Sequence, residues 1–346
     1  MFMPRWPPRF YIAASAFLFC IAAAPALSQP TSMVVGAIDF FGTDGVNVDA
    51  VRAALPLKPG DTLNEAEFDF LRVRVNPVVL AQTGKDSTDV SGVCCDSEHR
   101  LLLYIGLAGR NSQAIHRRKP PKGSSCLEPA ARQLYEKATD AMQSAVDAGE
   151  TAEDHSQGYA LSQNAAYRAR QVAMRDYAVA HTSELENVLR GCRFSEHRQA
   201  AAHMLGYADQ SREAIRALVD ASHDSDPGVR NNATRALWVI ASSAQPSARW
   251  IPAQPFVEML NSATWEDRNK AGLLLSALTE RRDAALLREL RHEALDSLVE
   301  MARWQELSHA GPYRLLLGRI AGIDESRLEQ LVADGKVDEI LAAVKR

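Results

Sequence analysis

Cysteine and histidine are the residue types in this sequence that could do chemistry. Cys94 and Cys95 are adjacent, but there is no C-x-x-C spacing and no second adjacent pair. A zinc site is therefore a poor expectation here. If both residues lie on a strand, their side chains point to opposite faces, so we expect the two thiols to diverge. One would lie in the core, and the other would be free to pair with a distant cysteine.

Histidines and carboxylates give no stronger signal of catalysis. No H-E-x-x-H, G-x-S-x-G or glycine-rich phosphate loop occurs in the sequence. The carboxylates lie among arginines on expected helices, which is ordinary solvated charge. We therefore predict no catalytic residue, no cofactor and no metal, and we expect the protein not to be an enzyme. Solvated helix faces are the expected place of five histidines: His181, His197, His203, His292 and His309.

The N-terminus has the pattern of a secretory signal peptide. Arg5 and Arg9 precede an apolar run, and the small residues of Ala26–Ser28 offer a cleavage site before Gln29. A single membrane anchor is the alternative, but the run is short for a span and contains Pro25. We expect residues 1–28 to be removed. The mature chain would then be periplasmic or secreted, without stable membrane insertion.

Four cysteines remain after this cleavage, which allows two disulfides in an oxidising compartment. They are Cys94, Cys95, Cys126 and Cys192. Cys126 opens an expected helix over residues 127–148, and Cys192 closes another over 159–190. Because antiparallel helices bring these ends to the same side, a Cys126–Cys192 bridge is reasonable. The unequal helix lengths are the argument against it.

The elements that position these residues fall into two modules. Residues 29–110 combine strands and helices in the order β-α-α-β-β, with a turn at Pro59-Gly60 and a "G…V…AL.LK.GD" run. This module resembles a POTRA domain, and the resemblance implies binding of other chains by strand addition at a sheet edge. Residues 111–125 have no apolar period and contain prolines, so they read as a linker. We expect residues 126–192 to form a helical hairpin.

From residue 193 to 346 the sequence repeats itself. The pattern R-x-x-A-x-x-x-L starts at Arg198, Arg230 and Arg268, at intervals of 32 and 38 residues. Helix pairs at this period indicate an α-solenoid, in which stacked repeats bury a shared core. "DPGVRNNATRAL", which begins at Asp226, resembles a HEAT-like repeat. The resemblance implies that the three arginines and Asp226 are structural and bond across neighbouring repeats.

An α+β module followed by an all-α solenoid points to binding rather than catalysis. The formal net charge of −4 argues against a nucleic-acid partner. We expect an exported, non-enzymatic scaffold that binds proteins of the bacterial cell envelope. One alternative is an envelope hydrolase or thiol-dependent enzyme with its site between the two modules. Another is an accessory of outer-membrane protein assembly.

Overall fold

The fold is described from a computed structural model that covers residues 32–345, apart from 65, 66, 69 and 244. The expected signal peptide, residues 1–28, lies outside the described residues. Within the described part of the chain, no helix is both long and apolar enough to span a bilayer.

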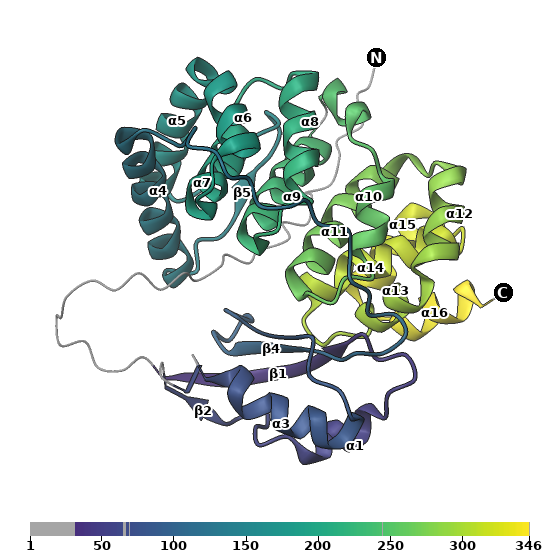
Figure 1. The fold of residues 1–346 in the computed structure, drawn as a ribbon. Helices are drawn as coiled ribbons and strands as arrows, with labels where there is room; N and C mark the ends of the chain where they lie inside the picture. The colour runs from purple at the N-terminus through teal and green to yellow at the C-terminus, as the bar shows by residue number, and fades with distance from the viewer. Residues whose placement is uncertain (1–31, 65–66, 69, 244, 346) are drawn as a thin grey trace.

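A four-stranded mixed sheet with two helices on one face forms the N-terminal module (Figure 1). The strands lie in the order β2-β1-β4-β3, with β1 parallel to β4 and the other pairs antiparallel. Its elements are β1 (Met33–Phe41), α1 (Val48–Ala54), β2 (Thr62–Leu63), α3 (Leu71–Thr83), β3 (Asp89–Val93) and β4 (Leu101–Gly106).

Strand β4 is buried along its whole length, because both faces of the sheet are covered. Leu101, Leu103 and Ile105 pack with α1 and α3 in the core of the module. The alternate residues Leu102 and Tyr104 belong instead to the core of the helical repeats. A strand of apolar residues without alternation is typical of a sheet covered on both sides.

From residue 129 onward, the described chain is helical apart from its connecting loops and one small hairpin. Its elements are α4 (Pro129–Asp147), β5 (Glu153–Asp154), β6 (Leu161–Ser162), α5 (Ala165–Ala180), α6 (Thr182–Gly191), α7 (Ser195–Leu205), α8 (Arg212–Ala221), α9 (Pro227–Ala241), η1 (Pro246–Trp250), α10 (Gln254–Met259), α11 (Trp265–Leu278), η2 (Thr279–Arg281), α12 (Ala284–Glu293), α13 (Leu295–Met301), α14 (Leu307–Ile320), α15 (Glu325–Ala333) and α16 (Val337–Val344).

Helices α7, α9, α11 and α14 stack side by side, and α8, α10 and α13 each pack on the next helix of that row. This is the arrangement of a helical repeat solenoid. The stacking buries wholly apolar side chains, such as Leu205 and Leu237, between successive repeats. The expected repeat architecture is therefore present.

One expected helix differs from the structure. Residues 159–190 form two helices, α5 and α6, which meet at His181, rather than a single long one. The Asn164 side chain caps α5 by accepting a hydrogen bond from the Tyr167 backbone N–H at 2.9 Å. Because this cap starts the helix at Ala165, the preceding residues are free to pair as the hairpin β5–β6.

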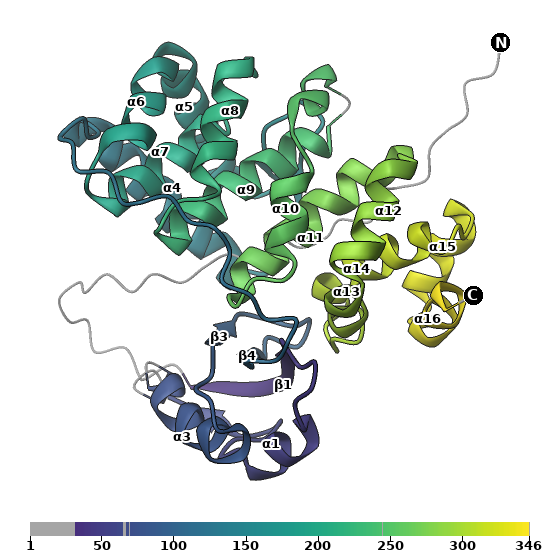
Figure 2. The same cartoon turned by 45° about the vertical axis from the view of Figure 1, so that its right-hand side comes forward.

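The N-terminal module docks on the C-terminal half of the repeats. Figure 2 shows the sheet beneath α11 and α13, with α1 and α3 on its far side. Tyr104 stacks on Trp265 with ring centroids 4.9 Å apart and lies 4.8 Å from the Trp304 ring. All three side chains are almost fully buried. The molecule thus has three layers: two helices, the sheet and the repeats.

Candidate functional site

Residues 111–125, here called the strap, run extended across the repeats (Figure 1). The backbone N–H of Gln113 donates to the Asn261 carbonyl at 2.7 Å, before α11. The Arg118 N–H donates to the His223 carbonyl at 2.7 Å, before α9. Near α7, the Gly123 carbonyl accepts from the backbone N–H of Arg193 at 3.0 Å. The expected linker is therefore a bound segment rather than a free tether.

The three repeat arginines each bind a carboxylate further along the chain. Arg198 makes a two-bond contact with Asp224 at 2.9 and 2.7 Å. Arg230 does the same with Asp267 at 2.7 and 3.2 Å. Arg268 donates to Glu300 at 3.0 Å. We call these pairs the ladder. All three arginine side chains are almost completely buried, so the ladder ties neighbouring repeats together.

The strap reaches the same carboxylates from outside. The Arg118 guanidinium donates to Asp224 at 3.1 and 2.5 Å, and Arg117 lies 3.7 Å from Asp267. The side-chain amide of Asn111 donates to Glu300 at 3.2 Å. Each carboxylate of the ladder thus binds one arginine of the repeats and one polar group of the strap. The repeats therefore contact side chains of the strap at three positions.

The loop after β1 completes the last position of the ladder. The backbone N–H groups of Gly42 and Thr43 each donate to Glu300 at 2.7 Å. Gly42 has a φ of +68°, and a Cβ there would lie 2.3 Å from the Leu107 carbonyl oxygen, so only glycine fits this turn. The ladder therefore also fixes the sheet to the repeats.

Asp226 caps a helix and contacts the previous repeat, but it does not bind an arginine of the ladder. Its carboxylate caps α9 by accepting from the Val229 N–H at 3.0 Å, and it accepts from Gln199 at 2.9 Å. The contact with Gln199 crosses to the previous repeat, but the partner of Arg198 is Asp224. Burial acts to raise the pKa of Asp224, but hydrogen bonds that include those from Arg198 and Arg118 outweigh this effect. The pKa therefore lies below its usual value.

No sequence signal marks the three ladder carboxylates as a set. Asp224 lies before the cap of α9, Asp267 lies inside the first turn of α11, and Glu300 lies near the end of α13. Since they occupy different positions in their repeats, the period of the arginines does not reveal them. Arg117 and Arg118 stand in a basic run that is unremarkable for a linker.

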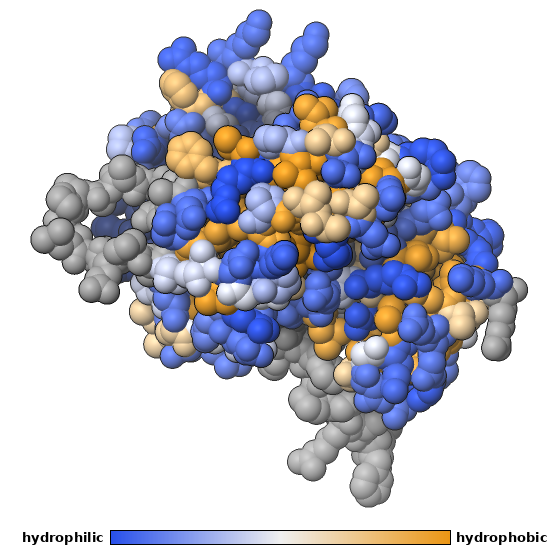
Figure 3. All heavy atoms as spheres, turned by 90° about the horizontal axis from the view of Figure 1, so that it is seen from below, coloured by the Kyte–Doolittle hydropathy of each residue, from blue (hydrophilic) through white to orange (hydrophobic). Residues whose placement is uncertain are grey.

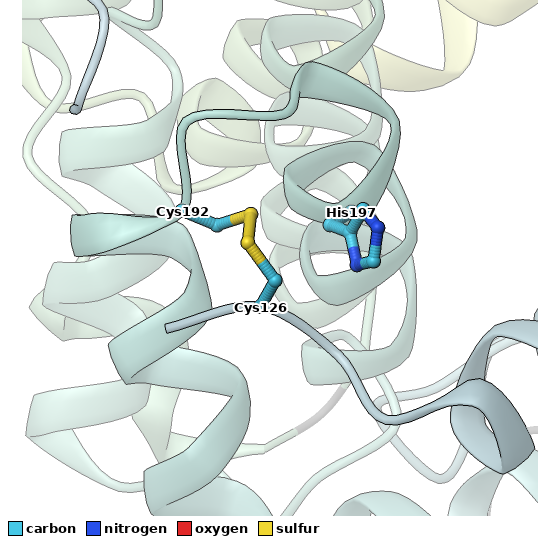
Figure 4. A group of neighbouring side chains, drawn as sticks. All are labelled: Cys126, Cys192 and His197. Atoms are coloured by element: carbon cyan, nitrogen blue, oxygen red, sulfur yellow. A yellow bond between two sulfur atoms is a disulfide. The ribbon is translucent and has the colours of Figure 1, made fainter. Parts of the chain in front are cut away.

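Cys126 and Cys192 lie at disulfide distance, with their Cα atoms 4.9 Å apart (Figure 4). The bridge joins the end of the strap to the loop before α7. His197, in the first turn of α7, completes a group of three potential metal ligands whose donor atoms lie within 4.8 Å of one another. However, both sulfur atoms are used in the disulfide, and His197 Nδ1 accepts the Leu127 N–H at 3.1 Å. These donors therefore serve to anchor the strap.

Cys94 and Cys95 are bonded to each other, so the expectation that they diverge was wrong. The reason is that β3 ends at Val93, and the alternation of side chains along a strand does not extend to the two cysteines.

Three of the five histidines lie away from solvated helix faces, contrary to the expectation. His203 is half-buried against the rings of Tyr135 and Tyr207, and burial lowers its pKa to about 3. His197 is 9% exposed and His309 is 3% exposed. Nδ1 of His309 lies 2.5 Å from the hydroxyl of Tyr104, at the contact between the sheet and α14. Burial lowers the pKa of His309 to about 3, so the ring is neutral.

Further titratable groups lie at the junction of β3 and α11. Asp89 accepts the Trp265 N–H at 2.8 Å. Burial and the nearby Asp89 carboxylate raise the pKa of Glu266 to about 7. One turn further, Lys270 is 1% exposed, and burial and Arg235 lower its pKa to about 7. Perturbed groups of this kind occur at functional sites and in structural networks alike.

Two hollows among the described residues differ in size and setting. A cavity of about 10 Å³, lined by residues that include His203, Asn232 and Arg235, has room for a single water molecule. A wide surface hollow of about 610 Å³ lies between α4 and α5, beside Lys137 and Arg170. Neither hollow contains the titratable groups at the junction of β3 and α11.

Comparison with known proteins supports the repeats. A family model described as HEAT repeats matches residues 182–249. No curated protein matches the chain. Among solved structures, a designed armadillo repeat protein for modular peptide recognition is 16% identical, with 62% of this chain and 83% of that chain covered and a TM-score of 0.34. A designed armadillo repeat protein in complex with the peptide (KR)4 is 14% identical, with coverage of 61% and 90% and a TM-score of 0.37. The family match identifies residues 182–249 as similar to HEAT repeats.

Proposed function

We propose that the protein is an exported, non-enzymatic scaffold of the bacterial cell envelope that binds protein partners. Helical repeat folds are typically binding scaffolds. The proposal combines that general property with three features of this chain: the bound strap, the free edge of the sheet and the paired cysteines.

The bound strap carries the proposal. The loops before α7, α9 and α11 hold an extended segment through its backbone and through arginine–carboxylate pairs. Backbone pairing with alternating side-chain contacts is a common way to bind a peptide. The repeats of this protein therefore already bind one extended segment, their own, with chemistry that suits a partner chain.

Strand β3 supplies a second surface. It lies at one edge of the sheet, next to β4, and its second residue, Val90, is half-buried. An exposed edge strand can accept a strand from another chain. The order of strands and helices in this module is compatible with the POTRA-like interpretation, so strand addition at β3 is the binding mode we propose for it.

The cysteines support export. All four cysteines among the described residues are paired. Disulfides persist in oxidising compartments such as the periplasm and are rare in the cytosol.

The enzyme alternative needs a polar pocket between the two modules. Tyr104, Trp265 and Trp304 fill the centre of that contact and are almost fully buried. This packing favours a structural role for the contact and supports the scaffold proposal over the alternative.

Photo-crosslinking in the cell tests the proposal. A photoreactive residue at Val90 is expected to capture an envelope protein in high yield, and the same residue at Leu307, 41% exposed on α14, is expected to capture much less. Capture of the same proteins at both positions, or none at Val90 in a folded and exported protein, would contradict binding at the β3 edge.

A further inference from the structure

Helix α3, together with its N-cap residue Phe70, carries apolar side chains on two opposite faces. Leu71, Val75 and Val79 face the sheet and are buried. On the opposite side, Phe70 is 59% exposed, Val73 is 67% exposed and Leu80 is 45% exposed, and Pro77 between them is exposed as well. We call the latter four residues the α3 stripe. Viewed from below, apolar residues gather across the middle of this face (Figure 3).

An apolar stripe of this kind needs an explanation. A helix with apolar residues all round is normally buried on all sides. The α3 stripe lies on the outermost layer of the molecule, and the sheet and repeats are on the other side of the helix. Contiguous exposed apolar residues on a soluble domain mark an interaction surface.

The spacing of the stripe indicates that its partner is a helix. Phe70, Val73, Pro77 and Leu80 follow one another at intervals of three, four and three residues. This is the spacing of the a and d positions that form the seam between two packed helices.

The same spacing is self-complementary. Read backwards, the intervals are again three, four and three. When two copies of α3 pack antiparallel about a two-fold axis, Phe70 of one copy lies beside Leu80 of the other, and Val73 lies beside Pro77. A two-fold interface requires this kind of self-complementary patch.

The charges beside the stripe permit this contact. Arg74 is the nearest basic side chain on one flank, and it is already paired with Glu67 at 3.5 Å. The other arginine of α3, Arg72, is exposed, and its guanidinium donates to the Ser87 carbonyl at 3.5 Å. Each arginine of α3 therefore already has a partner within its own copy.

The exposed area of the stripe limits how tightly two copies can bind each other through it. Four partly exposed apolar side chains provide on the order of 400 Å² per copy, about half of the area in a standard interface. The contact is therefore expected to be weak, with a dissociation constant above the micromolar range.

We infer that the α3 stripe is the contact surface of a weak, two-fold symmetric dimer, in which α3 packs antiparallel against α3 of a second copy. The surface lies away from the strap and from the repeats, so the dimer leaves the ladder and its bound segment undisturbed.

Sedimentation of the purified chain between about 10 µM and 1 mM tests the dimer. The wild-type chain is expected to associate with rising concentration, and Val73→Glu is expected to weaken association at least tenfold. Val172→Glu on α5, at a side chain 45% exposed, is the matched control and is expected to change nothing. A wild-type chain that stays monomeric at 1 mM would overturn the inference, as would equal association of both variants.

Disulfide trapping tests the antiparallel register. A Phe70→Cys chain mixed with a Leu80→Cys chain is expected to form a covalent dimer under mild oxidation. Either variant alone is expected to form far less covalent dimer. In a dimer of two identical copies, the engineered cysteines would lie about 15 Å apart along the helix axis. Equal trapping in all three samples would overturn the register. Vesicle binding that Val73→Glu abolishes in a chain without dimers would assign the stripe to a lipid surface instead.

Discussion

At the scale of single residues, the ladder carboxylates differ in how many cations hold them. Asp224 binds both Arg198 and Arg118, whereas Asp267 binds Arg230 closely and has Arg117 only at 3.7 Å. Removing one partner of a buried ion pair typically costs about 3–5 kcal/mol, because the other charge is left without compensation. We expect Arg230→Ala to approach that cost and Arg198→Ala to cost less. Urea unfolding of the two variants measures the difference.

The same reasoning predicts coupling between Arg198 and Arg118. Each single alanine variant leaves Asp224 with one arginine, but the double variant leaves it with none. The double variant is therefore expected to lose at least about 1 kcal/mol more than the sum of the single variants. Strict additivity would mean that the two arginines are not coupled through this carboxylate.

Lys270 is expected to destabilise the fold in a pH-dependent way. Within the described chain its ammonium group has no hydrogen bond or ion pair, and burial and Arg235 lower its pKa to about 7. Between pH 7 and the ordinary lysine value near 10.4, the unfolded chain binds this proton and the folded chain does not, so stability rises with pH. Lys270→Met is expected to stabilise the protein by about 3 kcal/mol at pH 8, and the gain should vanish near pH 10.5.

The measurement is chemical unfolding from pH 8 upward, where Glu266, with its pKa of about 7, is already ionised. Lys336→Met changes an exposed lysine and serves as the control. A gain that stays constant with pH would show that the pKa of Lys270 is the same in the folded and the unfolded chain, and would contradict this prediction.

At the scale of elements, the two disulfides are expected to contribute very differently. The Cys126–Cys192 bridge closes a long loop, with a sequence separation of 66, whereas Cys94–Cys95 has a separation of 1. Loop closure lowers the entropy of the unfolded chain in proportion to the logarithm of loop length. Replacing Cys126 and Cys192 by serine should cost about 2–4 kcal/mol, and replacing Cys94 and Cys95 should cost less than 1 kcal/mol. Non-reducing peptide mapping must find both bridges, and equal losses would contradict this account.

The elements that could be predicted from sequence are those fixed by local chemistry. Asp226 caps α9 and Pro227 starts it, because a side-chain acceptor and a proline satisfy the first turn without help from the rest of the fold. The strap could not be predicted in the same way. Its conformation depends on carbonyl groups and carboxylates up to 189 residues away, such as the contact of Asn111 with Glu300. The residues of the strap alone therefore do not indicate which distant groups bind them.

At the scale of the whole molecule, one local pattern did carry information about docking. β4 reads "LLLYIG", without alternation of polar and apolar residues, which is the mark of a sheet covered on both faces. Tyr104 is the residue that connects the two halves: its ring packs on Trp265 and Trp304, and its hydroxyl contacts His309. The pattern could not reveal which part of the chain covers the second face of the sheet.

Because the contact between the halves is apolar and continuous with the core of the repeats, we expect the protein to unfold in a single transition. Tyr104→Ala removes the ring from this contact while the neighbouring Leu103, which belongs to the core with α1 and α3, stays in place. Loss of a large buried side chain costs about 3–5 kcal/mol. The variant is therefore expected to split unfolding into two transitions, with the N-terminal module melting first. Calorimetry resolves them, and Leu103→Ala, which weakens the module itself, is the control. If Tyr104→Ala lowered one shared transition and left it single, the ladder contacts of Glu300 with Gly42 and Thr43, rather than the aromatic contact, would be what makes the two halves fold together.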